Sequence, residues 1–82
     1  MTARTNEAKT MKIKQIAPNV TELQQDGKTV LFSYSTAVAC TVNGTQYKTS
    51  QYYSKTTSKH INANGYGNAK AIPQDELNAL IN

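Results

Sequence analysis

Two dipeptides, Asp26-Gly27 and Asn43-Gly44, interrupt runs of alternating apolar and polar residues and constrain the fold more than any other feature of the chain. Both are typical of two-residue β-hairpin turns, whose central residues adopt positive φ angles. The pairs that these two turns predict are Gln25 with Lys28, Leu23 with Val30, Thr21 with Phe32, Val42 with Thr45 and Cys40 with Tyr47. We therefore expect an antiparallel meander.

The segment 30–42 alternates between large apolar side chains at even positions and small, mostly polar ones at odd positions. A period of two is typical of a β-strand with one covered face. Because the run exceeds the usual strand of about five or six residues, we expect a bend or bulge near Ser35-Thr36. The expected covered face comprises Leu23, Val30, Phe32, Tyr34, Val38, Cys40 and Tyr47.

The N-terminal part of the chain predicts an extension followed by one domain. Residues 1–10 are polar and aperiodic, so we expect a disordered extension, whereas a new alternation begins at Met11. Residues 11–82 are enough for a single domain. Strands are expected over 11–16 and 20–25, separated by the break at Pro18.

Helical signals appear after the strands. Ser54 or Thr57 is suited to cap a helix over 55–63, and Asn64-Gly65 is a typical C-terminal stop. A flexible turn over 65–68 should lead to a second helix that begins near Pro73 and buries Leu77, Leu80 and Ile81. The expected fold is α+β, with a meander of four or five strands and both the short and the C-terminal helix packed on one face.

Three blocks carry a resemblance to a known family: Ile16–Leu23, Lys28–Tyr34 and Tyr47–Asn62. They resemble a family of small bacteriophage proteins of unknown function, over about residues 11–80, and the family usually begins at the position of Met11. The resemblance implies a viral protein that acts in the cytoplasm of an infected bacterial host. It implies no activity.

Catalytic and metal sites are not expected. The available nucleophile–base pair is Cys40 with His60, but Cys40 falls on the expected apolar face, where a cysteine usually packs without reacting. His60 is expected to pack with Ile61 against the sheet; the alternative is a functional contact beside Lys59. One histidine and one cysteine do not complete a zinc shell, and no cofactor is predicted. No stretch approaches the roughly 20 apolar residues of a membrane span.

The formal net charge of +4 is distributed unevenly along the chain. Residues 27–74 contain no acidic residue and five lysines, which predicts an electropositive surface. Within this part, residues 47–60 interleave tyrosines with lysines and hydroxyl side chains. Lysines attract phosphates, hydroxyls bond to phosphate oxygens, and tyrosine rings stack on unpaired bases.

The leading functional hypothesis is therefore a non-enzymatic, sequence-independent contact with nucleic acid. The residues expected to carry it are Lys48, Tyr52, Lys55, Thr56 and Lys59. One alternative is a protein-binding inhibitor or modulator of a host factor such as a defence complex, a nuclease or a polymerase, because tyrosine-rich basic surfaces also bind proteins. A second alternative is a self-assembling structural component, in which an exposed sheet edge would pair two copies as a homodimer.

Overall fold

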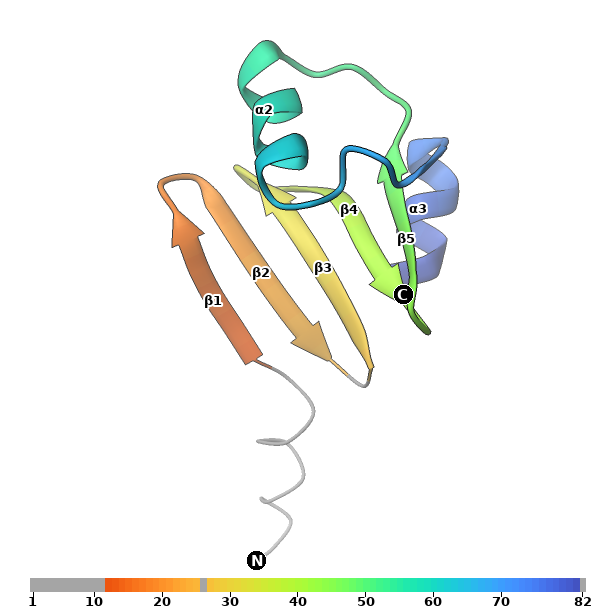
Figure 1. Cartoon of the computed structure of the whole chain (residues 1–82). Helices are drawn as coiled ribbons and strands as arrows, with labels where there is room; N and C mark the ends of the chain where they lie inside the picture. Colours follow the sequence, from red (N-terminus) through yellow and green to blue (C-terminus); the bar gives the residue numbers. More distant parts are fainter. Residues whose placement is uncertain (1–11, 26, 82) are drawn as a thin grey trace, which may run out of the picture.

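The computed structural model describes residues 12–25 and 27–81, which form one sheet and two helices (Figure 1). The elements are β1 (Lys12–Ala17), β2 (Val20–Gln25), β3 (Lys28–Ser33), β4 (Thr36–Val42), β5 (Thr45–Thr49), α2 (Lys55–Ala63), β6 (Lys70–Ile72) and α3 (Gln74–Ile81). Strand order follows chain order; all neighbours are antiparallel except β5 and β6, which are parallel. The α+β fold class is confirmed. The predicted extension over 1–10 lies outside the described residues.

Both hairpins have the register that their turns predict. β2 pairs with β3 so that Leu23 faces Val30, and β4 pairs with β5 so that Cys40 faces Tyr47. The second turn has the expected positive φ angles at both central residues, 52° at Asn43 and 83° at Gly44. The first turn contains Gly27, at a φ of 81°.

The segment 30–42 is a hairpin rather than one bent strand. Tyr34 and Ser35 form a turn, and the flanking residues of β3 and β4 pair with each other. Before this two-residue turn the even-numbered residues lie on one face of the sheet, and directly after it they lie on the other face. An irregularity at Val38 reverses it again, because Leu31 faces Ala39 while the next residue, Phe32, faces Ala37. The two reversals cancel. The alternation of large and small side chains therefore runs through 30–42 without interruption, and it does not show that the segment contains a turn.

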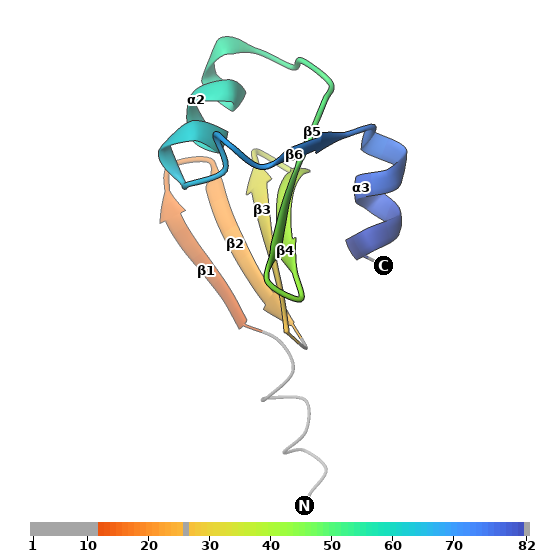
Figure 2. The same cartoon turned by 45° about the vertical axis from the view of Figure 1, so that its right-hand side comes forward.

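The two helices lie on opposite faces of the sheet, so the prediction that both pack on one face is wrong (Figures 1 and 2). The α2 face carries Leu31 and Ala39, which pack with Ile61 of α2. The α3 face carries Val30 and Cys40, which pack with Leu77 of α3. Because both faces of the central strands are apolar, each needs its own cover.

The expected covered face is confirmed in part. Leu23, Val30, Phe32, Cys40 and Tyr47 all belong to the cluster on the α3 face. Val38 is fully buried but belongs to the cluster on the opposite face, because the turn at Tyr34-Ser35 reverses the alternation and the irregularity restores it only after Val38. Tyr34 is exposed, because it occupies the β3–β4 turn.

The segment expected to be a flexible turn instead carries a core residue. Tyr66 is buried, its hydroxyl lies 2.9 Å from Oγ1 of Thr41, and its N–H donates to the carbonyl of Ile61. The chain then adds β6 beside β5, which raises the strand number to six rather than four or five. A strand of three residues is too short to show an alternation in the sequence.

Candidate nucleic-acid interface

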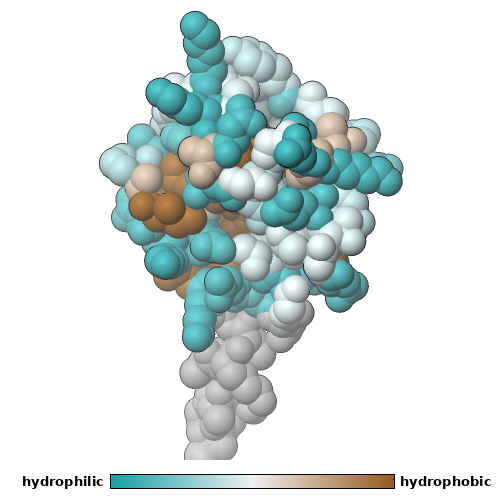
Figure 3. All heavy atoms as spheres, viewed as in Figure 1, coloured by the Kyte–Doolittle hydropathy of each residue, from teal (hydrophilic) through white to brown (hydrophobic). Residues whose placement is uncertain are grey.

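The charged residues of the described chain separate between the two sheet faces. The strand register shows on which face each charged residue lies, because directly paired residues have their side chains on the same face of the sheet. Lys14, for example, pairs with Glu22, and Glu22 pairs with Leu31, which lies on the α2 face. The α2 face and its helix hold five lysines and one acid: Lys12, Lys14, Lys48, Lys55, Lys59 and Glu22. The α3 face and its helix hold two of each: Lys28, Lys70, Asp75 and Glu76. The positive charge is therefore concentrated on the α2 face; in Figure 3 this side shows hydrophilic and near-neutral residues together with an apolar patch.

A buried polar network fixes α2 on the sheet. The hydroxyl of Ser33, on β3, lies 2.8 Å from Nδ1 of His60 and 3.1 Å from Oγ1 of Thr57. Ser54 caps the helix, because its hydroxyl accepts a hydrogen bond from the backbone N–H of Thr57 at 3.1 Å. His60 thus contacts the sheet next to the buried Ile61, which agrees with the structural role expected for it.

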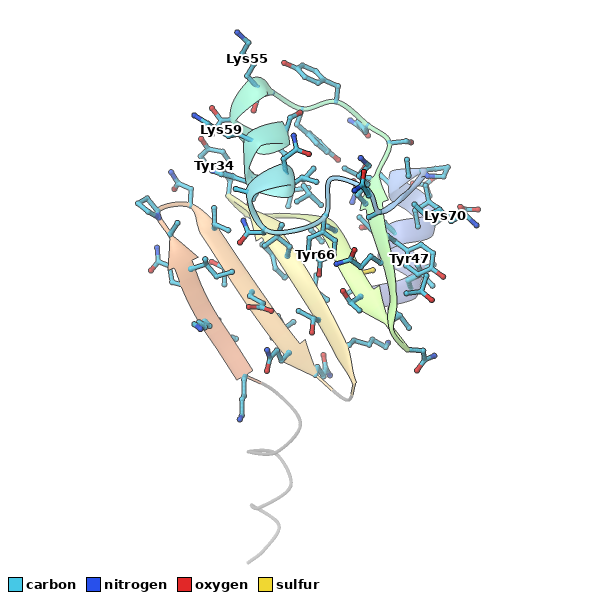
Figure 4. All side chains as sticks on the ribbon, in the orientation of Figure 1. Tyr34, Tyr47, Lys55, Lys59, Tyr66 and Lys70 are labelled. Carbon is cyan, nitrogen blue, oxygen red and sulfur yellow. The ribbon has the colours of Figure 1, made fainter. Side chains whose placement is uncertain are left out.

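The outward side of α2 carries three of the predicted binding residues. Lys55, Thr56 and Lys59 are all exposed. Figure 4 shows Lys55 pointing away from the molecule at the start of α2, and Lys59 projecting beside Tyr34. Lys55 and Lys59 are one helical turn apart, so their ammonium groups can contact neighbouring phosphates of one strand.

The other two predicted residues, Lys48 and Tyr52, line a cavity of about 230 Å³ between β5 and α2. Ser58 and Asn62 of α2 form part of the same lining. Nζ of Lys48 donates a hydrogen bond to the carbonyl of Gly67 at 2.7 Å, whereas Tyr52 is 70% exposed. The structure therefore places the five predicted residues in two groups: Lys48 and Tyr52 line the cavity, and Lys55, Thr56 and Lys59 are exposed on α2, which also borders that cavity.

Tyr34 was missed as a surface residue, because the alternation assigns it to the covered face. It is 54% exposed, and its ring centroid lies 6.0 Å from that of His60. Its φ angle of 59° is uncommon for a bulky side chain, and its N–H donates to the carbonyl of Asn19 at 2.7 Å. The sequence signal for this turn is the excessive length of the run 30–42. It predicted a bend near Ser35-Thr36, one residue after the observed turn at Tyr34-Ser35.

The Cys40–His60 pair is not assembled. Cys40 is buried on the α3 face, whereas His60 contacts Ser33 on the α2 face, so the sheet lies between them. Burial also raises the pKa of the Cys40 thiol, which disfavours the thiolate. Over 12–25 and 27–81, no group of three or more His, Cys, Asp or Glu side chains is placed to hold a metal ion. In those same ranges no helix is long and apolar enough to cross a membrane.

The raised pKa values of Cys40 and Tyr66 predict that the protein loses stability in alkali. Burial raises the pKa of both groups above their ordinary values of 9.0 and 10.0. Their contribution to stability is fully present below the ordinary values and is lost as pH rises toward the raised ones, because the unfolded chain loses these protons first. Urea unfolding should therefore show a free energy of unfolding that falls above about pH 9.

The matched variant for this measurement is Cys40→Ala combined with Tyr66→Phe, which removes both titrating groups from the core. Its stability profile should be flatter in alkali than that of the unchanged chain, although lower at neutral pH. An equally steep fall in the variant would show that other groups cause the loss.

Comparison with family models finds that residues 3–79 match a family described as a family of unknown function, DUF8033. The match begins before Met11, so residues 3–10 belong to the matched sequence, contrary to the start at Met11 that the resemblance indicated. Neither the curated proteins nor the solved structures contain a match to the chain.

Proposed function

We propose that this chain, which belongs to the DUF8033 family of unknown function, binds nucleic acid through the α2 face without sequence preference. The observation that carries this proposal is the separation of charge among the described residues: five lysines and one glutamate on this face, against two lysines and two acids on the other. A face with such an excess of lysine attracts polyphosphate backbones and releases their counterions.

The exposed tyrosines favour single strands over duplexes. Tyr52, in the lining of the cavity, and Tyr34, beside His60, are both largely exposed to solvent. Aromatic rings stack on bases that are unpaired, at about 1–3 kcal/mol per base, whereas duplex bases stack on each other. Lysines between such rings supply the phosphate contacts.

Reversing the charge of α2 tests the proposal. We expect Lys55→Glu combined with Lys59→Glu to weaken binding of a labelled single-stranded oligonucleotide at least about tenfold, because two lysines that attract phosphates are replaced by two acids that repel them. The slope of log affinity against log salt should also become shallower, by about 0.7 for each phosphate that the variant no longer neutralises. Fluorescence anisotropy at several salt concentrations measures both quantities.

The matched control is Lys28→Glu combined with Lys70→Glu, which changes the net charge equally on the opposite face. Equally weakened binding in the two variants would show that net charge, rather than the α2 face, controls the affinity. Flat titrations of the unchanged chain at low salt, with both single-stranded and duplex DNA and RNA, would contradict the proposal.

The proposal extends to location through the resemblance to small phage proteins. A protein of phage origin that acts in the cytoplasm of an infected bacterium would meet both DNA and RNA there. Detection of the chain by antibody in the cytoplasmic fraction of infected cells, with oligonucleotides crosslinked to it, tests this part. Recovery from another fraction alone would contradict it.

A further inference from the structure

The α3 face is covered over only part of its width. α3 packs against β4 and β5, and an apolar groove of about 360 Å³ remains over β1, β2 and β3. Its lining residues are Ile13, Thr21, Leu23, Phe32, Tyr34 and Ser35. Ile13 is 68% exposed, and together with Leu23 and Phe32 it gives the groove a contiguous apolar lining.

The groove ends at the outer edge of β1. β1 is the first strand of the sheet and pairs only with β2 among the described strands. All six of its residues are exposed. Among the described residues, the N–H and C=O groups on its outer side have no strand partner, so they can pair with an added strand.

The side chains of β1 define what such a strand should contain. Ile13 lies opposite Leu23 and faces the groove, whereas Lys12 and Lys14 face the other side of the sheet. In an added strand, the residues beside Ile13 would cover the groove and should be apolar. The residues beside the two lysines should be acidic, since opposite charges on facing strands attract.

We propose that β1 and this groove bind an extended protein segment in which acidic and apolar residues alternate, added to the sheet as a seventh strand. The inference shares Lys12, Lys14 and Tyr34 with the proposed nucleic-acid contact, but it rests on the groove and on the sheet edge and needs no residue of α2. It gives Lys12 and Lys14 a specific role, which is to attract the acidic residues of the added strand. The count of charges on each face does not separate these two lysines from the other lysines of the α2 face.

A second copy of the chain fits this edge poorly. Two β1 strands paired antiparallel about Ile13 would place Lys12 of one copy opposite Lys14 of the other. Pairing about Lys14 would place the two copies of that lysine opposite each other. Like charges on directly facing residues are destabilising, and lysines on an edge strand are a common protection against self-pairing.

A labelled peptide tests the proposal with the full chain. The probe has seven residues, glutamate alternating with valine and a phenylalanine at the centre; a scrambled peptide of the same composition is its control. We expect saturable binding of the alternating peptide and increased hydrogen-exchange protection of the β1 amides. Lys12→Glu combined with Lys14→Glu should weaken binding at least about tenfold, because attraction becomes repulsion on both facing pairs. Ile13→Asp, at an exposed position, should do the same by charging the groove.

The α2 variant Lys55→Glu with Lys59→Glu separates this proposal from the nucleic-acid contact, since it should keep the peptide affinity while its oligonucleotide affinity falls. Equal binding of the scrambled peptide, or no new protection in β1, would overturn the strand addition. An equal fall of peptide affinity in the α2 and β1 variants would also overturn it, by indicating attraction to net charge alone. A dimer in sedimentation velocity that Ile13→Asp dissociates would assign the groove to a second copy.

Discussion

Replacing Leu77 with alanine is expected to lower the free energy of unfolding by about 2–5 kcal/mol, the range for large-to-small substitutions in a packed core. Leu77 is fully buried, and with Val30, Cys40 and Ile72 it forms the cluster between α3 and the sheet. The whole domain is expected to have a stability of only about 4–12 kcal/mol at its size, so the variant should be partly unfolded at moderate temperature. Urea unfolding followed by circular dichroism measures the difference.

The matched comparison is Asn78→Ala, an exposed change on the same helix. It should shift stability by no more than about 0.5 kcal/mol, as surface substitutions usually do. A Leu77→Ala variant as stable as Asn78→Ala would show that α3 does not hold the sheet together. The cluster on the α3 face would then need another main contact.

Ser33→Ala is expected to cost about 1–3 kcal/mol, although it removes a single oxygen atom. The Ser33 side chain is 2% exposed and lies within hydrogen-bond distance of both His60 and Thr57. Its removal takes this partner from Nδ1 of the half-buried His60, whereas Oγ1 of Thr57 keeps the hydroxyl of Ser54 at 3.3 Å. An unsatisfied polar group away from water is costly. Ser35→Ala, in the exposed turn nearby, is the control and should change stability little.

This substitution also connects the fold with the proposed function. Because the Ser33 network holds α2 on the sheet, its removal should loosen the helix and weaken nucleic-acid binding with no change of net charge. Hydrogen exchange would then show faster exchange in α2 than in β2 and β3. Uniform destabilisation of all elements would instead show that α2 does not open separately, and an unchanged stability would show that the network contributes nothing.

Short-range chemistry made much of the fold predictable. The turn at Asn43-Gly44 requires residues that tolerate positive φ, and it has the expected register. α2 has the expected bounds, with Ser54 as its N-cap, because a cap hydroxyl and a terminal Asn64-Gly65 act on the immediately adjacent backbone. Burial of Leu77 follows from helical periodicity in the same way.

The features that could not be predicted depend on contacts between distant residues. Tyr66 is held in the core by Thr41, which lies 25 residues away. The short β6 exists because β5 offers it an edge, and no local pattern marks such a strand. In the candidate site, Lys48 and Tyr52 line one cavity and Lys55, Thr56 and Lys59 are exposed on α2, but the binding role of these five residues stays a prediction. Tyr34 was assigned to the wrong environment.

The sequence by itself determined the registers of the β2–β3 and β4–β5 hairpins, the two helices and the total charge, because turn conformation, capping and composition are properties of neighbouring residues. Only the tertiary structure decided which residues share a face. A turn at Tyr34-Ser35 and an irregularity at Val38 each reverse the alternation, and their effects cancel in the sequence. For the same reason the tertiary structure alone separated the lysines of the α2 face from the acids of α3, since a face is defined by strand pairing and not by position along the chain.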